Sequence, residues 1–123
     1  MATYILNIDP HTKPRMTRSD KWKHRTCVDS YFVFKNKLEN EAKRVKMPML
    51  PGDIELIKFI FPMPETWSKK KKAEMFGKPH QQTPDVDNCL KAVFDSLLKQ
   101  DKIIWSVRIE KYWSNEGKII IQF

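Results

Sequence analysis

The sequence lacks long hydrophobic runs and has little cysteine. No stretch approaches the roughly 18 to 20 apolar residues that a membrane-spanning helix needs. Its two cysteines, Cys27 and Cys89, lie far apart in no Cys-x-x-Cys pair, which excludes a structural zinc site built on cysteine. We expect both thiols to be reduced. Met1–Asp9 suits a strand better than a signal peptide, because acid and proline come at its end, so we expect an intracellular protein.

Acidic side chains are also in deficit. The 123 residues include 15 Asp and Glu against 23 Lys and Arg, a net charge of +8. Lysine and arginine gain affinity for phosphates by releasing counterions, so this excess favours a polyanionic partner such as nucleic acid. Charge alone is a weak indication, since many basic proteins bind no particular polyanion. The length and the 41% hydrophobic content predict one domain with one core, to which dimerisation would add stability.

The hydrophobic spacing predicts an α+β domain, a mixed sheet packed with helices in the order β-α-β-α-α-β-β. The clearest helix is Val86–Lys99, whose apolar residues recur every three or four positions. From Ile103 to Glu110 the period changes to two, which indicates a strand, and residues 115–117 suggest a turn to a hairpin partner. The other predicted elements are strands over 3–8, 54–61 and 118–123, a helix from Asp29 or Ser30 to before Pro48, and a short helix capped by Thr66.

Two segments concentrate positive charge. His11–Arg25 contains six basic residues against one acid, with no apolar periodicity; it is either a solvated loop or a phosphate-gripping arm with Trp22 as a stacking surface. The four lysines Lys69–Lys72 cannot all face a core, so they form a solubilising surface or a second phosphate-contacting patch. The candidate DNA-binding residues are Lys13, Arg15, Arg18, Lys69, Lys70, Lys71 and Lys72.

The residues suited to chemistry cluster at the start of the helix Val86–Lys99. Asp87 and Lys91 are neighbours at i and i+4, opposite the apolar stripe, and Asp85 lies just before the helix. Two carboxylates one residue apart can converge on a hard cation such as Mg²⁺. They can equally be a helix cap and a surface ion pair. A third acid, Asp101, returns to this pair only if the following strand runs alongside it.

The string from Pro84 to Asp95, P-D-V-D-N-C-L-K-A-V-F-D, resembles the signature of the RusA family of Holliday junction resolvases. That signature is roughly P-D-x-D-N-x-x-K-x-x-x-D, followed by a short connection, one or two acids and a strand. Lys13-Pro14-Arg15 is similar to the family's N-terminal pattern, and the segment from Met63 to Lys70 is similar to phage-type members. The resemblance covers most of the chain, although only the Asp-x-Asp-Asn-x-x-Lys block is specific.

The resemblance implies a homodimeric, Mg²⁺- or Mn²⁺-dependent crossover junction endodeoxyribonuclease. Such an enzyme hydrolyses phosphodiesters of branched DNA, above all four-way junctions, by paired nicks during DNA recombination and repair. It would be cytoplasmic, in a bacterial, phage or prophage context. Two alternatives are a non-catalytic nucleic-acid-binding module and a nuclease for other branched or single-stranded DNA.

The family's catalytic residues map onto four positions. The metal-binding acids correspond to Asp85 and Asp87, and the functional lysine to Lys91. The third acid, also a metal ligand, is best matched by Asp101 through a gapped alignment, because an ungapped match falls on Ser106, which cannot replace a carboxylate. We expect Asn88 to orient a neighbouring group. The remaining acid of the signature, Asp95, we expect to pair with Lys91 or Lys99.

Overall fold

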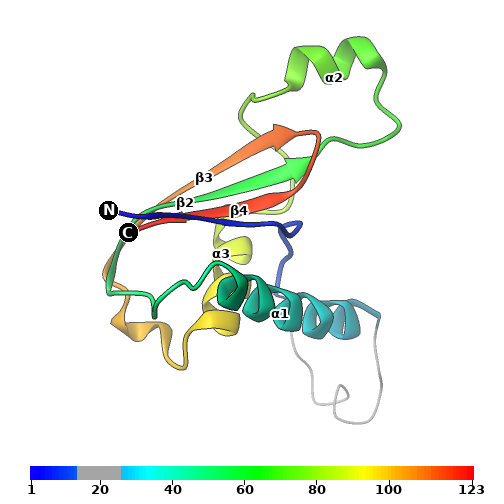
Figure 1. The fold of residues 1–123 in the computed structure, drawn as a ribbon. Helices are drawn as coiled ribbons and strands as arrows, with labels where there is room; N and C mark the ends of the chain where they lie inside the picture. The colour runs from blue at the N-terminus through cyan, green and yellow to red at the C-terminus, as the bar shows by residue number, and fades with distance from the viewer. Residues whose placement is uncertain (14–25) are drawn as a thin grey trace.

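The computed structural model describes residues 1–13 and 26–123, without the side chains of residues 26–28. It confirms the predicted α+β class and order of elements (Figure 1). None of the described helices is both long enough and apolar enough to cross a membrane. The elements are β1 (Thr3–Leu6), α1 (Thr26–Arg44), β2 (Asp53–Pro62), α2 (Lys69–Met75), α3 (Val86–Leu97), the 3-10 turn η2 (Asp101–Ile103), β3 (Ser106–Ser114) and β4 (Lys118–Gln122).

The four strands form one mixed sheet in the order β1-β4-β2-β3. β4 is antiparallel to β1 and to β2, whereas β3 pairs with β2 in parallel. The predicted hairpin of the last two strands is therefore wrong, because β2 lies between them. Parallel neighbours cannot be joined by a tight turn, so the chain passes through α2 and α3 between β2 and β3.

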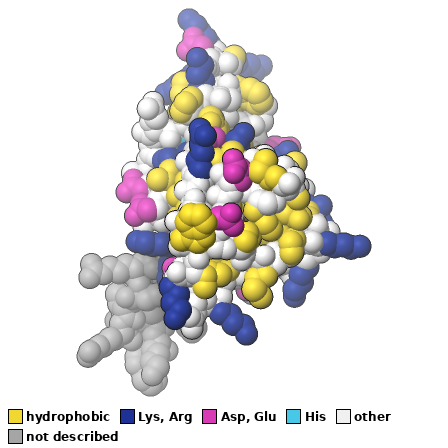
Figure 2. All heavy atoms as spheres, turned by 90° about the vertical axis from the view of Figure 1, so that its left-hand side faces the viewer, with side chains coloured by type: hydrophobic (Ala, Val, Ile, Leu, Met, Phe, Trp, Pro, Cys, Tyr) yellow, Lys and Arg dark blue, Asp and Glu magenta, His cyan; other side chains and the backbone are white. Residues whose placement is uncertain are grey.

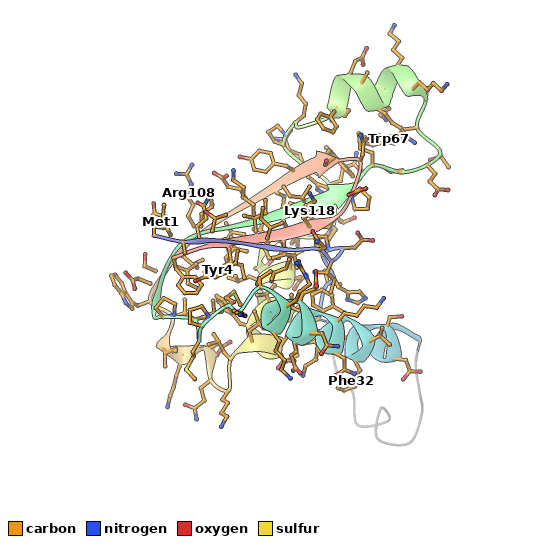
Figure 3. All side chains as sticks on the ribbon, viewed as in Figure 1. Met1, Tyr4, Phe32, Trp67, Arg108 and Lys118 are labelled. Atoms are coloured by element: carbon orange, nitrogen blue, oxygen red, sulfur yellow. The ribbon has the colours of Figure 1, made fainter. Side chains whose placement is uncertain are left out.

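Helices α1 and α3 cover the same face of the sheet (Figure 1). The core between them contains fully buried side chains from the central strands, such as Phe59 of β2 and Ile121 of β4, and Val93 of α3. Among residues 1–13 and 26–123, no helix packs across the opposite face of the sheet. Arg108 of β3 points to that side (Figure 3). Ile5 of β1 is 45% exposed. The apolar stripe seen in the sequence of α3 is thus core packing.

The helix starts differ from those predicted. α1 begins at Thr26, so Asp29 and Ser30 lie inside its first turns rather than at its cap. Asp29 still suits this position, because an acid in the first turn interacts favourably with the helix dipole. α2 is capped by Ser68, whose Oγ accepts a hydrogen bond from the Lys71 N–H at 3.1 Å, and not by Thr66.

The segment that leads into α3 is hydrogen-bonded along the free edge of β3. The Gly77 N–H donates to the Trp113 carbonyl at 2.9 Å, and the Trp113 N–H donates to the Lys78 carbonyl at 3.0 Å. The His80 N–H donates to the Lys111 carbonyl at 3.0 Å. The His80 ring is 4% exposed, with centroids 4.4 Å from the Phe61 ring and 4.0 Å from the Trp113 ring. This ring stack secures the segment against the sheet.

The buried state of His80 predicts a pH dependence of stability. Burial, and then the charge of Lys111, lower the pKa of His80. As the pH falls, His80 therefore binds a proton in the unfolded chain before it does so in the folded chain. The free energy of unfolding should consequently fall as the pH drops from about 6.5 toward the lowered pKa. His80→Phe should lose less stability over this window than the unsubstituted protein, as measured by urea denaturation. Equal losses in the two proteins would contradict this expectation.

Candidate active site at the entry of helix α3

Asp85 occupies the N-cap position of α3 with an extended backbone, φ −72° and ψ 150°, but its side chain makes no capping hydrogen bond. Its carbonyl accepts the Cys89 N–H at 3.2 Å, as an N-cap backbone does. Asp87 follows in the first turn, and both aspartates are exposed. The carboxylate of Asp85 is thus not used in capping.

Lys91 lies one helical turn beyond Asp87. Its Nζ is 3.9 Å from Asp87 Oδ2, and the two side chains are 61% and 66% exposed. A pair this long and this exposed contributes little to stability. Asp87 can therefore leave Lys91 to bind a cation, and Lys91 can leave Asp87 to bind a phosphate, at a small cost in free energy.

Lys111 fixes the chain just before the acid pair. Its ammonium donates to the Gln82 carbonyl at 2.7 Å and to the Pro84 carbonyl at 2.6 Å. This residue is not among the site residues predicted from the sequence. A signal was present just beyond the predicted strand, because Lys111 interrupts the apolar alternation of Val107, Ile109 and Trp113 along what is β3 in the structure.

Cys89 lies beneath the acid pair and is fully buried as a free thiol. Burial is the main reason that its pKa rises to about 11; the charge of Lys111 lowers the pKa, and the charges of Asp87 and Asp85 raise it. The thiol is therefore protonated at neutral pH and is a core residue, not a nucleophile. The reduced state expected for this cysteine agrees with the structure.

Asp95 pairs with neither Lys91 nor Lys99, so that expectation is wrong. It accepts a hydrogen bond from the Tyr31 hydroxyl, and it pairs with Lys35 at 3.1 Å and with Lys13 at 3.3 Å. Burial raises the pKa of Asp95, but the hydrogen bonds from Tyr31 and Lys35 lower it by more. The net pKa of Asp95 is therefore below its usual value. The physical reason is that the helix face of Asp95 meets α1, which supplies partners from far away in the sequence.

A cavity of about 550 Å³ runs along α3 from Lys91 to the residues after the helix. It is lined by four lysines and by two acids that face them, namely Lys13, Lys91, Lys99, Lys102, Asp95 and Asp101. Lys99 and Lys102 are not among the DNA-binding residues predicted from the sequence. Their placement beside Lys91 extends the positive surface away from the acid pair.

Asp101 begins the turn η2 beyond the far end of α3. A helix of 12 residues is about 18 Å long, so Asp85 and Asp101 lie toward its opposite ends. Across residues 1–13 and 26–123, no group of three acidic, histidine or cysteine side chains is arranged to hold a metal ion. The role of Asp101 as a third ligand stays a prediction.

The predicted DNA-contacting residues are distributed over two regions. Lys69–Lys72 lie on α2, which has no buried residue and projects from one end of the sheet (Figure 1). Trp67 lies at its base (Figure 3), with the Lys71 Nζ 4.3 Å from its ring centroid. Lys13 lies in the cavity along α3. The other predicted contacts, Arg15, Arg18 and Trp22, lie outside the described residues.

The acid pair suits a divalent cation. Mg²⁺ takes oxygen ligands in octahedral array, and commonly binds through one or two carboxylates together with waters and substrate phosphates. Asp85 and Asp87 offer two exposed carboxylates, one without a capping bond and the other in a 3.9 Å pair. The two carboxylates therefore fit the divalent cation that the resemblance implies.

The chain is similar to a known family of endonucleases over nearly its whole length. The model of the family Endodeoxyribonuclease RusA matches residues 7–123, nearly the whole chain. No curated protein matches the chain.

The network around Asp95 leads to a prediction about stability. Tyr31 is fully buried and bonds Asp95 between α1 and α3. Tyr31→Phe should lower the free energy of unfolding by about 1 kcal/mol, the usual net worth of a hydrogen bond. The matched control is Tyr112→Phe, whose hydroxyl donates to Glu110 at 2.9 Å within one strand. Urea denaturation should show a clearly smaller loss for the control; equal losses would contradict a special role for Asp95.

Proposed function

The chain belongs to the RusA family of endodeoxyribonucleases, and from this premise we propose that it resolves four-way DNA junctions by paired, metal-dependent nicks. The observation that carries the proposal is the exposed acid pair: the Asp85 side chain makes no capping hydrogen bond, and Asp87 makes only a 3.9 Å pair with Lys91. We propose Mg²⁺, or Mn²⁺, as the cofactor, and DNA recombination and repair in the bacterial or phage-infected cytoplasm as the setting. Hydrolysis of a phosphodiester is the reaction.

The residues of the site have separable roles in this proposal. Asp85 and Asp87 would hold the cation. When bound, the cation lowers the pKa of a water and stabilises charge on the attacked phosphate. Lys91 lies on the same exposed helix face as Asp87, and its ammonium neutralises phosphate oxygens as their charge grows. Asp101 as a further ligand stays a prediction that requires η2 to approach the start of α3.

The DNA backbone would follow the lysines. From the phosphate at Lys91, the cavity lined by Lys13, Lys99 and Lys102 offers charge to neighbouring phosphates of the strand. Contacts to phosphates position DNA without reading its sequence, which suits recognition of a branched shape. The lysines of α2 would hold a second region of the same substrate.

Two nicks require two active sites, so we propose a homodimer. Exposed apolar side chains on one side of the molecule support a second subunit. Figure 2 shows hydrophobic side chains gathered on the side that carries both chain termini. The most exposed large apolar residues are Met1, Met49 and Trp105, at 85%, 83% and 78%. Exposed patches of this kind commonly mark protein interfaces.

The acid pair gives the decisive test. Asp85→Asn and Asp87→Asn should each lower nicking of a synthetic four-way junction on the order of 10²-fold or more, as loss of transition-state electrostatics does. Junction binding should persist or improve, because removal of an acid also removes repulsion of phosphate. Asp53→Asn, an exposed aspartate at the start of β2, is the matched control and should nick normally.

Other outcomes of this test point elsewhere. If wild type binds junctions but does not nick them with Mg²⁺ or Mn²⁺, the chain is a binding module. If forks or single strands are cut faster than junctions, it is a nuclease for another DNA structure. Loss of binding together with nicking in Asp87→Asn would indicate a structural role for that acid.

The α2 lysines predict a salt effect. Replacing Lys69 and Lys70 with glutamine should weaken junction binding and reduce the slope of log affinity against log salt by about one for each lysine that had bound a phosphate. The control is Lys37→Gln with Lys43→Gln on α1, which removes the same charge from exposed positions elsewhere. Fluorescence anisotropy at several salt concentrations measures both slopes. An unchanged slope in the α2 variant would remove this helix from the DNA surface.

A further inference from the structure

We propose that Lys111 is the positioning residue of the acid pair: its ammonium holds the backbone just before Asp85 and places a fixed positive charge at the entry of α3. This inference rests on the proposed function and names a residue that the family signature around Asp85 does not contain.

A series of hydrogen bonds connects β3 to the segment before α3. The segment before α3 follows the edge of β3 through backbone hydrogen bonds, the last of which joins the His80 N–H to the Lys111 carbonyl. Beyond it the Lys111 side chain continues the connection, with its ammonium on the carbonyls of Gln82 and Pro84 at 2.7 and 2.6 Å. The residue after Pro84 is Asp85. The Lys111 side chain thus holds the carbonyls of Gln82 and Pro84 beside β3, where the backbone pairing has ended.

The backbone of Asp85 is consequently held on both sides. On its N-terminal side, Lys111 binds the Pro84 carbonyl. On its C-terminal side, the Asp85 carbonyl accepts the Cys89 N–H and starts the helix. The side chain makes no capping bond, so its direction depends on this backbone. Preorganised ligands bind a cation without first losing conformational freedom.

The positive charge of Lys111 is the second feature that supports its role at the acid pair. Within residues 1–13 and 26–123, Lys111 makes no ion pair, and its ammonium donates to carbonyls alone. The ammonium lies on the carbonyl of Pro84, the residue directly before Asp85, so its positive charge is held at the entry of α3.

Lys111 differs in this from Lys91. The ammonium of Lys91 is exposed on the outer face of α3 and can reach a phosphate, whereas that of Lys111 is occupied by two carbonyls. Loss of Lys111 should therefore disturb cation binding and turnover more than DNA affinity. A direct role in holding DNA would give the opposite division.

The test uses Lys111→Met, Lys111→Gln and Lys111→Arg in the full chain. The matched control is Lys58→Met, because Lys58 alternates with the buried Ile57 and Phe59 and so points to the other face of the sheet. Binding of Mn²⁺ without DNA, followed by the electron paramagnetic resonance of the free ion, reports on the site independently of nicking. Junction nicking gives kcat and KM separately, and circular dichroism establishes folding.

We expect Lys111→Met to weaken Mn²⁺ binding by about 10-fold or more and to lower kcat by a similar factor, the usual effect of losing a group that orients metal ligands. KM for the junction should stay within about twofold. Lys111→Arg, which keeps the charge and the donors, should recover much of both losses. Lys58→Met should match wild type.

The results that overturn the proposal are distinct from failure of the proposed function. If Lys111→Met does not fold, Lys111→Gln decides, since its amide can still donate to one carbonyl. Wild-type Mn²⁺ binding in the folded Met or Gln variant, or a raised KM with unchanged kcat, overturns the positioning role. If wild type nicks no branched DNA, the proposed function fails, while the Mn²⁺ measurement still tests Lys111.

Discussion

The parallel pairing of β2 with β3 is the constraint on which the arrangement of the site depends. Two parallel neighbours need a crossover, and here the crossover contains α2 and α3. α3 must pack on the sheet to bury Cys89, Ala92 and Val93, and the chain then returns through β3. Because the return runs beside β2, Phe59 lies opposite Lys111, and the lysine comes to the entry of α3.

Helix α3 contributes to both the core and the candidate site because one of its faces is apolar and the other is polar. The apolar face is buried against the sheet, whereas the charged residues of the polar face have different partners. Asp95 is drawn inward by Tyr31 and Lys35 of α1, which fixes the helix. Asp87 and Lys91 keep only a loose pair with each other. The tightly held acid is structural, and the loosely held one is available for chemistry.

Positive charge is placed in layers around this acid pair. One lysine lies behind it against the sheet, one lies beside it on α3, and others line the cavity that continues along the helix. A further group projects on α2 at a distance from the core. A distribution of this kind favours a polyanionic partner.

The sequence by itself determined the class and order of the fold, the helix α3 and the acid pair, because periodicity and a short local motif involve residues close together along the chain. Only the tertiary structure decided the partners: that β4 pairs with β1 and β2 instead of β3, and that Asp95 binds Tyr31 and Lys35. It likewise decided that the chain returns to the site with Lys111, ten positions after the predicted Asp101. These interactions join residues distant in sequence, and they follow from which strand neighbours which. No local pattern records that choice.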